Sequence, residues 1–197
     1  MRTIFERGYF HSYRIQDSHF STVVNRTELL LENQVISSKT KVFLSHKHSD
    51  LDDLKDLIGF LEQKYNVDVY IDSMDKAMPS STSGATATRI KSVIKKCDKF
   101  ILLATDDAVE SKWCNWELGF GDAQKFRDDI AILPIKDVGK YDFQYKGSEY
   151  MSIYPHIIYY DGSEQYDTGE SVTPGFYYGY LNDSGIRVIT PLSRWLK

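Results

Sequence analysis

The sequence predicts an α/β protein in which helices cover both faces of a parallel sheet. From residue 41 onward, short apolar runs alternate with segments whose apolar residues recur at helical spacing. Strands that are apolar throughout are typical of parallel sheets buried on both sides. The pattern therefore predicts a doubly wound, flavodoxin-like parallel sheet of five strands, preceded by an N-terminal extension.

Five apolar runs are the expected strands. They lie at residues 42–45, 67–72, 100–104, 130–135 and 157–160. Three segments between them carry a helical apolar stripe, at residues 51–61, 90–97 and 108–125. Ligands of doubly wound proteins bind beyond the carboxyl ends of the strands. This rule indicates three segments as the ligand edge: residues 45–48, 72–85 and 105–107.

The two ends of the chain differ from this alternating core. Residues 1–39 are expected to form a partly helical extension, with a short helix over residues 27–34. The main domain is expected over residues 40–162. Residues 163–197 are expected to be a tyrosine-rich segment that packs on this domain; ten of the fourteen tyrosines lie after residue 140.

Composition narrows the class of protein and its partners. The net charge of −4 argues against non-specific binding to nucleic acid or to anionic membranes, which requires a basic surface. No apolar run is long enough to span a bilayer, and the N-terminus has no secretory signal. Two cysteines make neither a disulfide framework nor a zinc site. We expect a cytoplasmic protein without a metal and without nucleic-acid or membrane partners.

The segment Ser111–Leu118 places one carboxylate among aromatic rings. At helical spacing, Trp113, Trp116, Glu117 and Phe120 share one face. A carboxylate on such a face loses hydration, which costs free energy unless the group gains a partner or a chemical task. From this helix alone two interpretations stay open: a catalytic Glu117, or a half-buried glutamate paired with a Lys or Arg.

Four segments resemble the conserved boxes of TIR (Toll/interleukin-1 receptor) domains. Lys41–His46 resembles the first box, and Val69–Asp72 with the polar loop after it resembles strand B and the BB loop. Lys99–Thr105 resembles strand C. Ser111–Leu118 is closely similar to the Ser-x-Trp-Cys-x-x-Glu-Leu box of catalytic TIR domains. The resemblance covers about residues 40–162 and is greatest to prokaryotic stand-alone TIR proteins, including those of Thoeris-type anti-phage systems.

The resemblance implies a reaction and its partners. Catalytic TIR domains cleave the nicotinamide–ribosyl bond of NAD, and release ADP-ribose by hydrolysis or a cyclic ADP-ribose isomer by cyclisation. NAD would be a substrate here, with no further cofactor. The resemblance also implies self-association through the BB loop, residues 73–85, and an effector protein that senses the product. The expected role is in bacterial anti-phage defence.

The same resemblance suggests the site residues. Glu117 matches the catalytic glutamate, which would stabilise positive charge on the ribose. The substrate-binding residues are expected to be Ser45, His46, Asp72, Lys76, Trp113 and Cys114. Several keep a second interpretation: Trp113 as a core residue, His46 as an exposed loop residue, and Lys76 as a solvated lysine. Asp72 would then bond the backbone amides of the polar loop.

Two other function classes remain as alternatives. One is a non-catalytic TIR module that acts only through TIR–TIR contacts. The other is a related glycosyl-transfer enzyme of flavodoxin-like fold, such as a nucleoside deoxyribosyltransferase, with a glutamate nucleophile. The first box and the BB-type loop favour a TIR domain over the transferase, and the intact Trp-Cys-x-x-Glu box favours a catalytic one.

Overall fold

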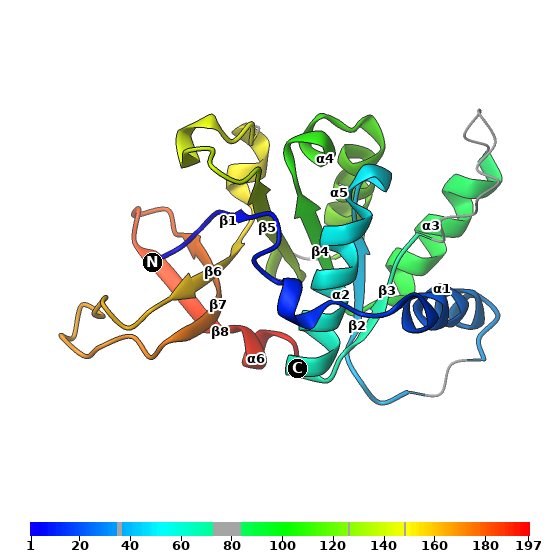
Figure 1. The fold of residues 1–197 in the computed structure, drawn as a ribbon, viewed down its shortest axis with the longest axis horizontal. Coiled ribbons are helices and arrows are strands. Elements are labelled where there is room, and N and C mark those ends of the chain that lie inside the picture. Colours follow the sequence, from blue (N-terminus) through cyan, green and yellow to red (C-terminus); the bar gives the residue numbers. More distant parts are fainter. Residues whose placement is uncertain (35–36, 73–83, 126, 148) are drawn as a thin grey trace.

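The computed structural model describes residues 1–34, 37–72, 84–125, 127–147 and 149–197. Helices lie on both faces of one central sheet, which confirms the predicted doubly wound α/β fold (Figure 1). The sheet has eight strands in the order β3-β2-β4-β5-β6-β7-β8, with β1 beside β5. All three predicted parts of the chain contribute strands to this sheet.

The elements have the following bounds. The strands are β1 Phe5–Glu6, β2 Lys41–Ser45, β3 Asp68–Tyr70, β4 Lys99–Ala104, β5 Ile130–Lys136, β6 His156–Tyr160, β7 Gly175–Leu181 and β8 Arg187–Pro191. The α-helices are α1 Asp17–Leu31, α2 Leu51–Tyr65, α3 Gly84–Lys96, α4 Asp106–Glu110, α5 Lys112–Gln124 and α6 Leu192–Trp195. The 3-10 helices are η1 His11–Tyr13, η2 His48–Asp50, η3 Arg127–Asp129, η4 Asp142–Gln144 and η5 Glu149–Ile153.

The five predicted strands are present and parallel, but the prediction of a five-stranded sheet is wrong. They correspond to β2, β3, β4, β5 and β6. The tyrosine-rich segment adds β7 and β8, which extend the sheet in antiparallel fashion at the left of Figure 1. Gly179 interrupts the apolar pattern of β7, because a Cβ there would lie 2.7 Å from Ile158 of β6. Close packing against β6 therefore requires a residue that weakens the strand signal.

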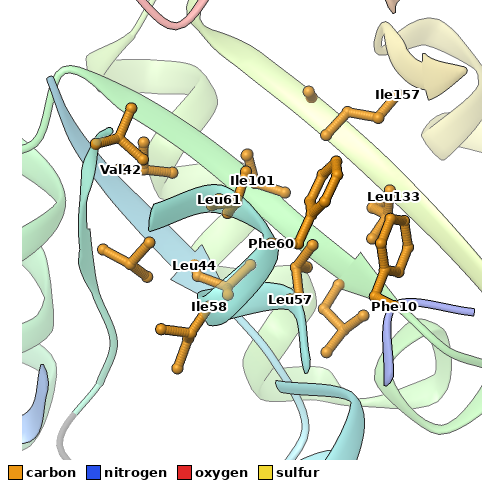
Figure 2. Close-up of a cluster of buried hydrophobic side chains, with 14 of the residues drawn as sticks. Phe10, Val42, Leu44, Leu57, Ile58, Phe60, Leu61, Ile101, Leu133 and Ile157 are labelled. Atoms are coloured by element: carbon orange, nitrogen blue, oxygen red, sulfur yellow. The ribbon is translucent and has the colours of Figure 1, made fainter. Parts of the chain in front are cut away.

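Two apolar clusters hold the helices on the sheet. Side chains alternate between the faces of each strand, so Val42 and Leu44 of β2 join one cluster and Phe43 joins the other. The first cluster packs against η1, α2 and α6, and Figure 2 shows it around Phe10 and Phe60, whose ring centroids lie 4.6 Å apart. The second cluster packs against α3, α4 and α5.

Helix α1 covers the edge of the sheet at β3. Thr27 Oγ1 accepts a hydrogen bond from the Ile71 backbone N–H at 3.4 Å, and Arg26 donates to the Val69 carbonyl at 3.4 Å. These contacts satisfy backbone groups that an open edge strand leaves unpaired. The predicted helix at residues 27–34 is displaced, since α1 spans Asp17–Leu31. Its β-branched residues have low helix propensity, and packing on the sheet edge decides its position.

The extension also ties three loops together through Arg7. Its guanidinium contacts Asp50 at 3.1 Å, Asp137 at 2.8 Å and Asp53. Asp50 is buried and also accepts a hydrogen bond from the hydroxyl of Thr105 at 2.6 Å. The segments after β2, β4 and β5 are thus joined by one cation, and a cleft of about 650 Å³ lies beside it.

The helices that the structure describes are each too short or too polar to cross a lipid bilayer.

Gly59 allows η1 to pack directly on α2, which gives a stability prediction. A Cβ at Gly59 would lie 1.8 Å from the carbonyl oxygen of Tyr13. Gly59→Ala should therefore lower the free energy of unfolding by about 1–3 kcal/mol, as overpacking does, in urea denaturation. The matched control is Gly119→Ala in α5, where a Cβ meets nothing within 4 Å. This control should raise the free energy of unfolding by about 0.5–1 kcal/mol, because alanine favours a helix more than glycine does. Equal effects of the two substitutions would contradict the close contact between Gly59 and Tyr13.

Arg7→Gln removes the cation from two buried or nearly buried carboxylates, Asp50 and Asp53. The free energy of unfolding should fall by up to about 3 kcal/mol, somewhat less than for a fully buried pair because Arg7 is 31% exposed. Lys146→Gln is the control, since it breaks an exposed ion pair with Glu110 and should cost less than about 1 kcal/mol. Equally small losses in the two variants would refute the role of Arg7.

Candidate active site

Six of the seven predicted site residues converge beyond the carboxyl ends of β2 and β3. These are Ser45, His46, Asp72, Trp113, Cys114 and Glu117. All but Trp113 are buried, and Trp113 is half-buried. Lys76 and most of the predicted BB loop lie outside the described residues, so their predicted roles stay predictions. The site therefore joins two strand ends to helix α5, as expected for a doubly wound sheet.

A capping serine sets where helix α5 begins. Ser111 has an extended backbone, with ψ of 117°, and its hydroxyl accepts a hydrogen bond from the Cys114 N–H at 3.4 Å. This residue separates α4 from α5, so the single helix predicted over residues 108–125 is two helices. The serine competes with the helical backbone for the N–H group, which makes Ser a strong start signal and a poor interior residue.

Helix α5 approaches the sheet closely enough to bring Glu117 to β2. Gly121 lies one helical turn after Glu117, and a Cβ there would lie 2.9 Å from the ring of Phe100 in β4. Cys114 and Leu118 are also buried on this side. A larger residue at position 121 would push α5 outward and separate Glu117 from the sheet.

The Glu117 carboxyl is the most deeply buried acidic group of the site. It is 1% exposed, and its Oε2 accepts a hydrogen bond from the Ser45 hydroxyl at 2.5 Å. Its Oε1 has no hydrogen-bond partner within the described residues. Burial raises the pKa of Glu117 well above its usual value, and the nearby charge of Asp72 raises it further, against the opposing effect of Ser45.

Asp72 and His46 form a second buried pair beside this carboxyl. His46 Nδ1 lies 3.5 Å from Asp72 Oδ1. Neither carboxyl oxygen of Asp72 has a hydrogen-bond partner within the described residues, and the same holds for His46 Nε2. The loop amides that Asp72 was expected to bond lie mostly outside the described residues. His46 is a buried site residue, so its interpretation as an exposed loop residue is wrong.

The aromatic residues of α5 form a stack on the outer side of the site. Trp113 and Trp116 lie 4.8 Å apart and Trp116 and Phe120 lie 6.1 Å apart, measured between ring centroids. The Lys91 ammonium caps Trp116 at 5.5 Å. The three rings are half-buried, whereas Glu117 is buried against the sheet. The rings and the carboxyl therefore do not share one environment, although helical spacing places them on one face. Trp113 Nε1 has no hydrogen-bond partner of normal geometry within the described residues, but its N–H lies close enough to Glu117 to lower the pKa of that carboxyl.

Cys114 supports the site and is not a nucleophile. Its thiol donates to the carbonyl oxygen of His46 at 3.3 Å. Burial raises the pKa of Cys114 to about 11, so the reactive thiolate is scarce at neutral pH. The contact fixes the backbone between Ser45 and the loop that follows β2.

The unpartnered atoms indicate what this site can bind. The buried atoms without a hydrogen-bond partner in the described part of the chain include carboxyl oxygens of Glu117 and Asp72, a ring nitrogen of His46 and the indole N–H of Trp113. Burying such groups is costly unless a ligand completes their hydrogen bonds. The carboxyl oxygens and the ring nitrogen can accept hydrogen bonds from hydroxyl groups, the indole N–H can donate one, and the two carboxyls favour a ligand with positive charge. Among the described residues no group of His, Cys, Asp and Glu is placed to hold a metal ion.

An ion-pair network that no sequence pattern predicts braces this site. Arg7 lies in the extension, outside all the boxes, and Asp50 follows the first box by four residues. The Arg7 guanidinium contacts Asp50, which follows His46 in the loop after β2. Asp50 in turn bonds Thr105, the residue that caps α4. The ion-pair partners lie 43 residues apart, so no local pattern reveals them.

Comparison with known proteins identifies the family. A family model described as TIR domain matches residues 42–167. A curated protein of Bacillus cereus (strain MSX-D12), described as a probable 3' cyclic ADP-D-ribose synthase ThsB', is 31% identical over 154 residues. The match covers 75% of this chain and 78% of that protein. With the sheet order, the strand-end site and the buried glutamate of α5, these matches show that the chain belongs to the TIR domain family.

Proposed function

We propose that this TIR protein cleaves the nicotinamide–ribosyl bond of NAD, with Glu117 as the catalytic residue. The observation that carries the proposal is the Glu117 carboxyl, buried at the strand ends with one oxygen fixed by Ser45 and the other free. The relative from Bacillus cereus is described as a synthase of a cyclic ADP-ribose, a product that contains this ribose after nicotinamide has left.

Charge explains how one carboxyl promotes this reaction. Nicotinamide leaves as a neutral molecule from a cationic pyridinium, so the leaving group needs no proton. The positive charge passes to the ribose, and a fixed carboxylate beside it stabilises that charge in a site without bulk water. Ser45 orients the carboxyl, while Oε1, without a partner among the described residues, is left to interact with the substrate.

The raised pKa of Glu117 couples its ionisation to substrate binding. Burial and Asp72 favour the protonated form in the empty site. A cationic substrate beside the carboxyl favours the ionised form, since an opposite charge lowers the pKa of an acid. Binding of a cationic substrate therefore favours the ionised, catalytic form of Glu117.

The proposed product is a cyclic ADP-ribose isomer. The supporting fact is the similarity to a probable 3' cyclic ADP-D-ribose synthase over most of both chains. Cyclisation and hydrolysis share the same bond cleavage and differ in which hydroxyl attacks the ribose. We further propose that the protein works in cytoplasmic anti-phage signalling, self-associates through residues 73–85 and delivers its product to a sensing effector.

Glu117→Gln tests the function directly. The variant keeps the size of the side chain and an acceptor for Ser45 but removes the charge. We expect nicotinamide release from NAD to fall by at least a factor of about 10²–10³, the usual loss for one preorganised electrostatic group. Products are resolved by HPLC and mass spectrometry at several protein concentrations, and the companion product separates cyclisation from hydrolysis.

The control for this experiment is Glu110→Gln, an exposed glutamate at the end of α4 that pairs with Lys146. It should retain the wild-type rate. A wild-type chain that releases no nicotinamide at any concentration, with or without a crowding agent, would instead favour the non-catalytic TIR module. Equal rates in wild type and Glu117→Gln would remove Glu117 from the mechanism.

The same substitution should stabilise the fold at neutral pH. Because the pKa of Glu117 is raised in the folded state, the folded protein binds more protons than the unfolded chain, and stability falls as the pH rises above the unfolded pKa. Glu117→Gln has no such penalty, so it should gain about 1–3 kcal/mol at pH 8, or about 2–10 °C in Tm. The gain should shrink toward pH 4, and thermal melts at both pH values measure it. If the stability gained by Glu117→Gln instead grew toward pH 4, the ionised carboxyl would be stabilising the fold, which would contradict the raised pKa.

A further inference from the structure

His46 presents a free ring nitrogen to the site that contains Glu117. Its Nδ1 lies 3.4 Å from the carbonyl oxygen of Leu44 and 3.5 Å from Asp72 Oδ1. A carbonyl and a carboxylate both accept protons and donate none, so Nδ1 is the nitrogen that carries the proton. Nε2 therefore has its lone pair free, and it has no hydrogen-bond partner within the described residues.

The imidazole is held in one orientation. Its own carbonyl accepts the thiol proton of Cys114 at 3.3 Å, which fixes the backbone. The ring stacks on His48, with centroids 6.1 Å apart and planes 14° apart. An imidazole whose one nitrogen bonds a carbonyl oxygen beside a carboxylate, and whose other nitrogen is free, can act as a general base. Burial lowers the pKa of His46, so the ring is neutral at pH 7 and can accept a proton.

We propose that His46 Nε2 accepts the proton of the hydroxyl that attacks the ribose, and that Asp72 is its positioning residue. This inference rests on the proposed function. It assigns separate tasks to the two buried groups: Glu117 stabilises the ribosyl cation, and His46 removes the proton from the incoming oxygen. In the proposed function Asp72 acts only through its charge on Glu117; here it also fixes the tautomer of His46.

The step balances as follows. The carbon–nitrogen bond to nicotinamide breaks, and its electron pair stays on the nicotinamide nitrogen. The oxygen of water, or of a hydroxyl in the adenosine half of the same substrate, forms a bond to the ribosyl carbon. Its proton passes to His46 Nε2, and the imidazolium is stabilised by the Asp72 carboxylate. The ring then releases this proton to solvent, so that the net reaction yields one proton.

The test uses His46→Asn. Asparagine keeps an N–H donor where Nδ1 lies, toward Leu44 and Asp72, but has no group at the position of Nε2. We expect the rate of nicotinamide release to fall by about 10²–10⁴-fold, the typical contribution of a general base. Azide attacks as an anion and has no proton to lose. It should raise the rate of the variant at least about tenfold and give azido-ADP-ribose, detected by mass spectrometry.

Three further variants make the outcome specific. His19→Asn removes an exposed imidazole of α1, outside the site, and should keep the wild-type rate without a response to azide. Asp72→Asn should lose less activity than His46→Asn and should also respond to azide. If His46→Asn fails to fold, the azide response of Asp72→Asn tests the proposal in its place. Glu117→Gln should stay inactive with azide, because its defect precedes the attack.

The two proposals fail in different ways. A wild-type chain that never releases nicotinamide overturns the proposed function itself. An active wild type with His46→Asn equal to His19→Asn overturns only the base assignment. A folded His46→Asn that is inactive and does not respond to azide also overturns it, because the imidazole would then support the site without accepting the proton.

Discussion

The structure depends on one buried carboxyl, that of Glu117, held against the sheet by Ser45 at the end of β2. A buried acid with an unpartnered oxygen opposes folding, so the rest of the molecule must hold α5 close to the sheet. Gly121 removes the side chain that would keep α5 away from Phe100, and Cys114 and Leu118 pack beneath the helix. Strain of this kind is typical of catalytic sites, where a group serves the reaction at the expense of stability.

The segments outside the family match brace this core. Residues before 42 add β1 beside β5, cover the β3 edge with α1 and place Arg7 among three carboxylates. Residues after 167 add β7 and β8, and Trp195 of α6 donates its indole N–H to the carbonyl of Asp128 at 2.6 Å. The Arg7 network ends at Thr105, which caps α4, so the extension reaches the same strand ends as the site.

The site contains two buried groups, the Glu117 carboxyl and the His46 imidazole. In each group one atom is hydrogen-bonded and another has no partner among the described residues. Ser45 bonds Glu117, and the Leu44 carbonyl bonds His46, whose Nδ1 lies 3.5 Å from Asp72. Both unpartnered atoms are buried. A low local dielectric constant strengthens electrostatic interactions there, so a cationic substrate would be attracted more strongly than in water. The aromatic rings of Trp113, Trp116 and Phe120 stack on one another on α5 and pack against the second apolar cluster.

The sequence by itself determined the parallel strands, the strand-end location of the site and the central place of Glu117, because apolar periodicity and a local box encode them. Only the tertiary structure decided the tyrosine-rich strands, the break at Ser111, the inward turn of Glu117 from its aromatic neighbours and the Arg7 network. These features arise from contacts between residues far apart in the chain, such as Ser45 with Glu117, 72 residues away. Local propensity carries no information about such contacts, and packing on the sheet overrides it.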